Sequence, residues 1–173
     1  MTTNEEHGQL RVKEHADRVR LFQMLCALDP VQGTPLSQLE IESRLEELFV
    51  LPGSQPGEPQ SEIVLQEDDE LASGLVTFDE FRQTCERAVQ VQNTFADADA
   101  LVEQHSTGWK VARMAVVDRT LIRLAIYEAF IAKSVPVNVA LSEAVVIAKE
   151  FGGAESARFV NGILARIAKA LQR

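Results

Sequence analysis

The sequence predicts an all-α protein of about seven helices. Apolar residues recur at three- and four-residue spacing along most of the chain, which is typical of amphipathic helices. Aromatic residues are few, with eight Phe, one Trp and one Tyr, and this composition suits helices packed on helices better than a β-sheet. Strand signals and internal repeats are both absent. A chain of 173 residues is most simply one domain, so residues 1–173 are expected to form a single unit.

The first half of the chain alternates between helical patterns and segments that exclude regular structure. Residues 1–10 are polar and are expected to form a frayed tail. A helix is predicted over residues 13–28, and Asp29-Pro30 ends it because the residue before a proline is disfavoured in helical conformation. A second helix is predicted over residues 36–51. The Pro- and Gly-rich stretch and the acidic run that follow predict a mobile loop at about 52–74.

The next three predicted helices lie between residues 78 and 133. Residues 78–92 carry an apolar stripe, and Thr77 is a plausible cap. A short helix is predicted over residues 95–104. Residues 116–133 are apolar on nearly every side, which is typical of a helix buried in the middle of a bundle.

Two further helices and the glycines between them complete the chain. Pro136 suits the first turn of a helix that runs to about Phe151. Gly152-Gly153 ends it, because glycine tolerates the left-handed cap conformation. The last helix is predicted over residues 155–171. The glycine pair before this helix could cradle a phosphate on free N–H groups or could simply make a tight helix–helix connection.

Net charge is −9, but the acidic residues are unevenly distributed. Residues 29–103 hold seventeen acids against three bases, whereas residues 104–173 hold five acids against ten bases. Nucleic acids are bound largely through Lys and Arg on phosphates, so an acidic chain normally argues against them. Because the acids lie mainly in the middle, a basic face formed by the two ends is still compatible with the sequence.

No catalytic or metal-binding pattern is present. His7, His15 and His105 are scattered, so neither a metal site nor a cofactor is expected, and the chain is not expected to be an enzyme. Cys26 and Cys85 belong to no Cys pair or Cys/His cluster and are expected to be small buried residues. The N-terminus lacks a secretory pattern and no stretch is long enough to span a membrane, so a cytoplasmic location is expected.

The last third of the chain resembles a known family at many fixed spacings. The matching residues are Trp109, Arg113–Arg119, Leu121–Glu128, Val135-Pro136, Val139-Ala140, Glu143-Ala144, Ala148-Lys149, Phe151-Gly152-Gly153, Ser156 and Arg158–Gly162. Together they resemble the NusB family of transcription antitermination factors, which bind RNA.

The resemblance implies a compact helical bundle of two small subdomains without catalysis. It also implies binding to the single-stranded boxA element of ribosomal RNA operon transcripts, together with the ribosomal protein NusE. The pair would act within the RNA polymerase antitermination complex.

The resemblance also suggests contact residues, because cationic groups hold an RNA backbone and flat groups stack on its bases. The expected RNA-binding residues are Arg11, Lys13, Arg18, Arg20, Phe151, Arg158 and Phe159. The expected partner-binding residues are Asp118, Arg123 and Cys26. Several have simpler alternatives. Arg18 and Arg20 could only solvate a helix end, the two phenylalanines could belong to the core, and Arg158 could pair with Glu155. Asp118 could cap a helix, and Asn161 and Gly162 could serve close helix packing.

A second hypothesis follows from departures from the family pattern. The first helix of the family usually begins with a dense arginine cluster, whereas Glu14 and Asp17 interrupt the bases here. An aromatic residue is common in the family where Cys26 stands. The alternative is therefore a NusB-like protein–protein interaction module, for example a homodimer, with weakened or lost RNA binding.

Overall fold

The computed structural model describes residues 2–29, 40, 78–106 and 108–171, with side chains in the first helix from residue 13 onward. The described residues form helices and the short segments that connect them and contain no strand, which confirms the all-α class. The predicted helix over residues 36–51, apart from residue 40, and the predicted loop at about 52–74 lie outside the described residues.

The first helix, α1, is longer than predicted and spans Thr2–Ala27. Its second half is fixed by apolar burial, since Leu21, Phe22 and Leu25 are almost completely removed from solvent. The expectation of a frayed tail over residues 1–10 is wrong for residues 2–10, which continue the same helix. These residues include no proline, and acidic side chains near a helix N-terminus interact favourably with the helix dipole. The polar composition of residues 2–10 is therefore compatible with a helix.

The next two helices match their predicted positions closely. Helix α3 spans Phe78–Gln92 as predicted, and α4 spans Phe95–His105, one residue longer than predicted. Thr94 lies in the turn between them, where its N–H donates to the Val91 carbonyl at 3.0 Å. The cap expected at Thr77 lies outside the described residues.

The central helix is buried as predicted but ends differently. A 3-10 turn, η1, over Val111–Arg113 leads into α5, Val116–Ile126, and every residue from 120 to 126 is buried. The helix then widens into a π-helical segment, η2, over Tyr127–Ile131. Lys133, which was predicted to lie within this helix, adopts a φ of 52°. The helix therefore ends two residues earlier than predicted.

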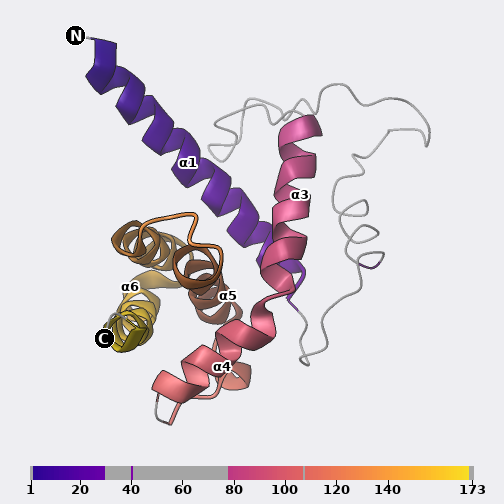
Figure 1. The fold of residues 1–173 in the computed structure, drawn as a ribbon, viewed down its shortest axis with the longest axis vertical. Helices are drawn as coiled ribbons and strands as arrows, with labels where there is room; N and C mark the ends of the chain where they lie inside the picture. The colour runs from indigo at the N-terminus through magenta and orange to yellow at the C-terminus, as the bar shows by residue number, and fades with distance from the viewer. Residues whose placement is uncertain (1, 30–39, 41–77, 107, 172–173) are drawn as a thin grey trace.

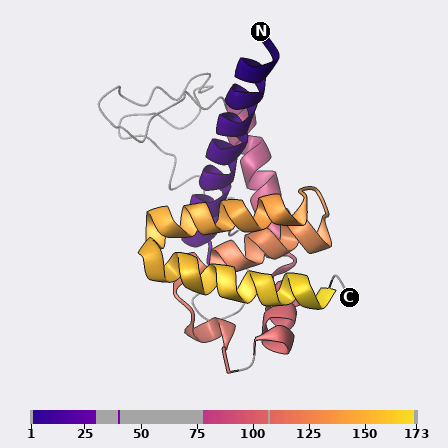
Figure 2. The same ribbon diagram turned by 90° about the vertical axis from the view of Figure 1, so that its left-hand side faces the viewer.

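Helix α6 spans Val137–Leu171 and bends sharply at Gly153, where φ is 82° and ψ is −173°. The predicted break between two helices is thus confirmed at the second glycine. Pro136 lies directly before the helix, and its carbonyl accepts the N–H of Ala140 at 3.0 Å. Figure 2 shows the two halves of α6 running back along each other beside α5.

Substituting Gly153 should destabilise the protein, because its backbone lies in a region that is essentially restricted to glycine. We expect Gly153→Ala to lower the free energy of unfolding by about 1–3 kcal/mol in chemical denaturation. Gly162→Ala is the matched control, since Gly162 is helical and a Cβ there would meet nothing within 4 Å. It should raise stability by about 0.5–1 kcal/mol. Equal stability of Gly153→Ala and the unmodified protein would contradict this account of the bend.

The helices share one hydrophobic core. Helix α6 packs along α5, α1 packs against α3 and α5, and α4 contacts both α5 and α6. Buried apolar residues from all of these helices form one cluster, which runs from Leu21 in α1 to Ile167 in α6. The N-terminal part of α1 extends beyond this packed region (Figures 1 and 2).

Candidate nucleic-acid interface

Two cations of the first helix that were predicted to bind RNA are paired with carboxylates. Lys13 Nζ lies 3.1 Å from an oxygen of Glu80 on α3. The Arg20 guanidinium donates to Asp17 one turn away. Both cations retain solvent exposure, and exposed ion pairs contribute little and exchange readily. Lys13 and Arg20 therefore remain available to a phosphate, whereas the side chain of Arg11 lies outside the described set.

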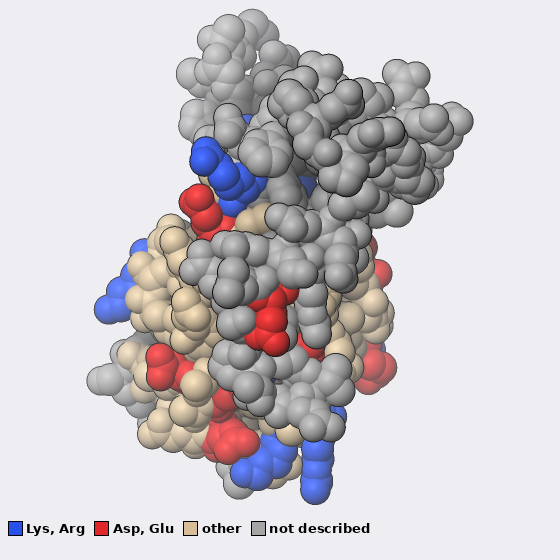
Figure 3. Space-filling view, turned by 90° about the vertical axis from the view of Figure 1, so that its right-hand side faces the viewer, with Lys and Arg blue, Asp and Glu red and all other residues tan. Residues whose placement is uncertain are grey.

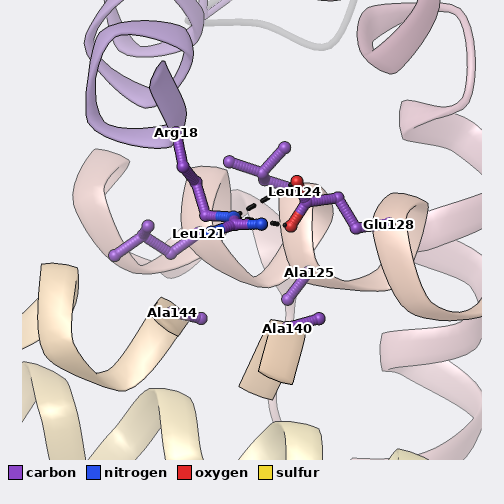
Figure 4. Close-up of a pocket in the computed structure, with 7 residues that line it drawn as sticks. All are labelled: Arg18, Leu121, Leu124, Ala125, Glu128, Ala140 and Ala144. Atoms are coloured by element: carbon purple, nitrogen blue, oxygen red, sulfur yellow. Dashed lines mark hydrogen bonds and ion pairs between the residues drawn. The ribbon is translucent and has the colours of Figure 1, made fainter. Parts of the chain in front are cut away.

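Arg18 points into the protein instead of toward solvent. Its Nε donates to Glu128 at 2.9 Å and its Nη1 lies 3.4 Å from Glu143, so it joins α1 to η2 and α6. Only 11% of its side chain is exposed, against 1% for Glu128. Figure 4 shows Arg18 reaching across from α1 to Glu128 above Leu121 and Ala140. The charge of Arg18 is already engaged in a buried pair, which favours a structural role, and its contact with RNA stays a prediction.

The two phenylalanines that were predicted to stack on bases have different surroundings. Phe151 is half-buried and packs against Phe22 of α1, with ring centroids 5.2 Å apart. Phe159 packs edge-on against Trp109, with centroids 4.7 Å apart. Trp109 is 48% exposed, the largest aromatic surface that the described residues offer to solvent. An accessible aromatic pair therefore lies where the segment before η1 meets the second half of α6.

The exposed face of the second half of α6 carries cations beside this aromatic pair. Arg158, Gly162, Arg166 and Lys169 are all exposed. With 3.6 residues per turn, they lie within about a quarter of the helix circumference. We call these four residues the α6 stripe. The sequence analysis named Arg158 as an RNA contact and Trp109 only as part of the family resemblance. It did not single out Arg166 or Lys169, although their spacing from Arg158 along the helix was visible.

Arg158 of this stripe pairs with Glu155, as one of the sequence alternatives proposed. The nitrogen–oxygen distance is 2.6 Å, and both side chains are more than two-thirds exposed. Such a pair is strongly screened by solvent and salt, so it does not withdraw Arg158 from a ligand. Asn161 and Gly162 are exposed as well, and the alternative that they serve close helix packing is wrong.

On the opposite side of the molecule, the described residues mix exposed acids with exposed bases such as Arg82 and Arg87 of α3. Figure 3, the view from the right-hand side of Figure 1, shows Asp and Glu side chains distributed over this face, with Lys and Arg mostly at its edges. Exposed acids on α3 and α4 include Glu86, Asp97 and Glu103. Among the described residues, the second half of α6 is the helix face on which exposed cations outnumber exposed acids most clearly.

The three residues that were predicted to bind a protein partner are mostly engaged inside the fold. Asp118 accepts a hydrogen bond from the Ser156 hydroxyl, which ties the start of α5 to the bend in α6. Arg123 is buried between Asp99 and Asp29, at 2.7 and 2.9 Å. Its guanidinium carbon lies 4.3 Å from the centroid of the Phe95 ring. This network already satisfies the Arg123 guanidinium, which favours a structural role, and its contact with a partner stays a prediction.

Cys26 is half-buried and therefore gives a partner little to contact. Burial raises the pKa of its thiol to about 11. At neutral pH it is thus an uncharged, weakly nucleophilic group. The described residues also include no cluster of His, Cys, Asp or Glu suited to a metal ion, and no helix among them is long and apolar enough to cross a membrane.

The sequence profile of the NusB family matches residues 53–169, more than half of the chain. The chain belongs to the NusB family. The matched region contains Trp109, the bend at Gly153 and the whole α6 stripe. The surface described above therefore lies within the part of the chain that defines a NusB protein.

Individual relatives give the same result. The chain is 46% identical over 91 residues to the transcription antitermination protein NusB of Agathobacter rectalis, which covers 52% of this chain and 70% of that protein. It is 43% identical over 74 residues to the NusB protein of Bacillus licheniformis, covering 43% of this chain and 57% of that one. With the NusB protein of Symbiobacterium thermophilum, the match spans half of the relative's length.

Solved structures share the fold over nearly the whole chain. NusB of T. maritima superimposes with a TM-score of 0.55 at 28% sequence identity, covering 89% of this chain and 90% of that one. A crystal structure of the antitermination factors NusB and NusE in complex with double-stranded RNA gives a TM-score of 0.61 at 18% identity. That match covers 91% of this chain and 96% of the other, and it shows likeness of fold.

Proposed function

We propose that this protein is a transcription antitermination factor that binds boxA-type single-stranded RNA of ribosomal RNA operon transcripts together with the ribosomal protein NusE. The observation that carries the proposal is the family match over residues 53–169, supported by relatives named as antitermination proteins. A neighbour in fold was crystallised as a complex of NusB, NusE and RNA. The RNA polymerase antitermination complex is the setting in which such a pair would act.

The chemistry of the surface near Phe159 supports an RNA ligand. Single strands are held by cationic side chains along the backbone and by aromatic faces on which bases stack. Trp109 offers such a face, Phe159 packs edge-on against it, and the exposed Arg158 is the residue directly before Phe159 on the helix. Base–aromatic stacking contributes about 1–3 kcal/mol per base, so one accessible ring is a substantial part of a binding site.

The alternative function, a NusB-like protein–protein module with lost RNA binding, is favoured by one observation. Lys13, Arg18 and Arg20 on the first helix each meet a carboxylate, and Arg18 is buried. Arg18 is thereby withdrawn from solvent, and any ligand of Lys13 or Arg20 has to compete with the carboxylate that each one meets. A homodimer that covers the RNA face would be one form of this alternative.

A polarisation titration with a labelled boxA RNA tests the proposed function. Full-length protein is titrated against boxA RNA and a scrambled RNA of equal composition, with and without NusE, at two salt concentrations. We expect boxA RNA to bind more tightly than the scrambled RNA, because both RNAs offer the same phosphate contacts but only boxA offers the matching base contacts. We also expect NusE to tighten the binding of boxA RNA further. Equal affinity for both RNAs, combined with NusE binding that does not depend on RNA, would favour the protein–protein module.

A further inference from the structure

The second half of α6 carries two exposed cations beyond Arg158, the cation that lies beside the Trp109–Phe159 pair. Arg166 and Lys169 are exposed, and neither makes an ion pair with any described residue. They continue from Arg158 along the same face for eleven residues, about 16 Å at 1.5 Å per residue. Glu155, at the start of this face, is the only acid among the exposed residues of this half of the helix. The charge on this face is therefore a row of separated cations.

Small residues lie between these cations on the surface of the helix. Gly162 and Ala165 are both exposed between Arg158 and Lys169, and a Cβ on Gly162 would meet nothing within 4 Å. Nothing bulky from the described residues therefore stands between the cations. A chain of phosphates could approach the helix along its whole length, whereas a folded protein surface would find few apolar anchors there. Among the described residues, Leu171 is the one large exposed apolar side chain on this half of α6.

The position of the aromatic pair relative to this row is also informative. Phe159 directly follows Arg158 and lies about two helical turns before Arg166, on the neighbouring side of the helix. Trp109 packs against Phe159. Stacking groups therefore lie along one edge of the cations near the start of the row. Backbone-binding cations bordered by stacking groups are the arrangement that tracks a single strand.

We propose that the α6 stripe is a backbone track for single-stranded RNA, which extends the footprint from the Trp109–Phe159 pair to Lys169. The inference rests on the proposed function and deepens it. Arg166 and Lys169 contact phosphates and not bases, so they add affinity without adding sequence preference. The RNA bound by this protein is accordingly longer than the segment whose bases the aromatic pair reads.

The test compares charge reversals by polarisation titration at four or more salt concentrations, using boxA and scrambled RNA. Arg166→Glu is matched with Lys133→Glu, which changes the net charge equally at an exposed lysine between η2 and α6 that makes no ion pair with any described residue. Arg166→Glu plus Lys169→Glu gives the larger effect. Because all of these positions are exposed, each variant should fold normally, which circular dichroism and thermal denaturation check.

The double variant is expected to lose at least about tenfold in affinity for both RNAs alike, and its salt slope should fall by about 0.7 per cation removed. Lys133→Glu should leave the slope unchanged.

A salt slope of the double variant equal to that of the unmodified protein would overturn the track, even if boxA RNA still binds specifically. If unmodified protein fails to prefer boxA RNA but the slope depends on the stripe, the proposed function fails and the track stands. Loss of boxA preference in the double variant would also overturn the track, because it would mean that the stripe reads bases.

Discussion

Asp29→Ala is expected to lower the free energy of unfolding by about 3–5 kcal/mol, because it removes the buried carboxylate that two largely enclosed guanidinium groups share. Asp29 is 6% exposed and pairs with both Arg119 and Arg123 of α5. Arg123 would keep Asp99, but Arg119 would keep only the Met114 carbonyl as a hydrogen-bond partner. The pair also fixes the end of α1 against the central helix. Its loss should therefore weaken the contact between the two halves of the sequence.

Urea denaturation measures this effect, and Glu103→Ala is its control. Glu103 pairs with Lys110 at 3.3 Å, but both side chains are largely exposed. Removing this pair should cost no more than about 1 kcal/mol. If Asp29→Ala were as mild as Glu103→Ala, the buried network would not have the structural role described here.

Arg18→Met is expected to destabilise the protein by about 3 kcal/mol, because Glu128 would keep a buried charge with only the partly exposed Arg87 nearby, at 3.6 Å. The double variant Arg18→Met plus Glu128→Met should recover most of this stability, since two apolar side chains of similar length can pack where the ion pair lay. Denaturation of the single and double variants measures the recovery.

The same double variant separates a structural role of Arg18 from an RNA contact. Arg18 is almost enclosed, so boxA affinity of the folded double variant should equal that of the unmodified protein. Arg20→Met provides a comparison on the same helix, because Arg20 is more exposed and its affinity loss would report a phosphate contact. A large affinity loss in the double variant, with stability restored, would return Arg18 to the RNA surface.

Helices with strong apolar periodicity were predicted well from sequence. Helix α3 was predicted with its observed bounds, and the apolar character of residues 120–126 correctly indicated the centre of the bundle. The bend at Gly153 was also expected, because glycine is favoured where a helix ends in a left-handed conformation. The N-terminal part of α1 was missed because the sequence of residues 2–10 shows no apolar periodicity, which is the signal on which the prediction relied.

Side-chain partners were predicted less well, because they depend on contacts between distant parts of the sequence. Arg18 and Glu128 are 110 residues apart, and nothing local to either one indicates the pair. Arg123 and Asp29 are separated by 94 residues in the same way. A cluster of arginines on one helix therefore predicts positive charge, but only the fold decides which of these charges reach solvent. Arg166 and Lys169 of the α6 stripe lie beyond the family motif, which ends at Gly162, so the motif did not indicate them.

Intrinsic fluorescence of Trp109 tests the central claim most directly, because it is the single tryptophan of the chain and lies in the proposed RNA site. Protein is titrated with boxA RNA while tryptophan emission and polarisation of the labelled RNA are followed together. A base stacked on Trp109 should quench its emission, and the quenching should saturate at the RNA concentration at which polarisation saturates. RNA that binds fully by polarisation while Trp109 emission stays unchanged would contradict this account and would place the RNA on another surface.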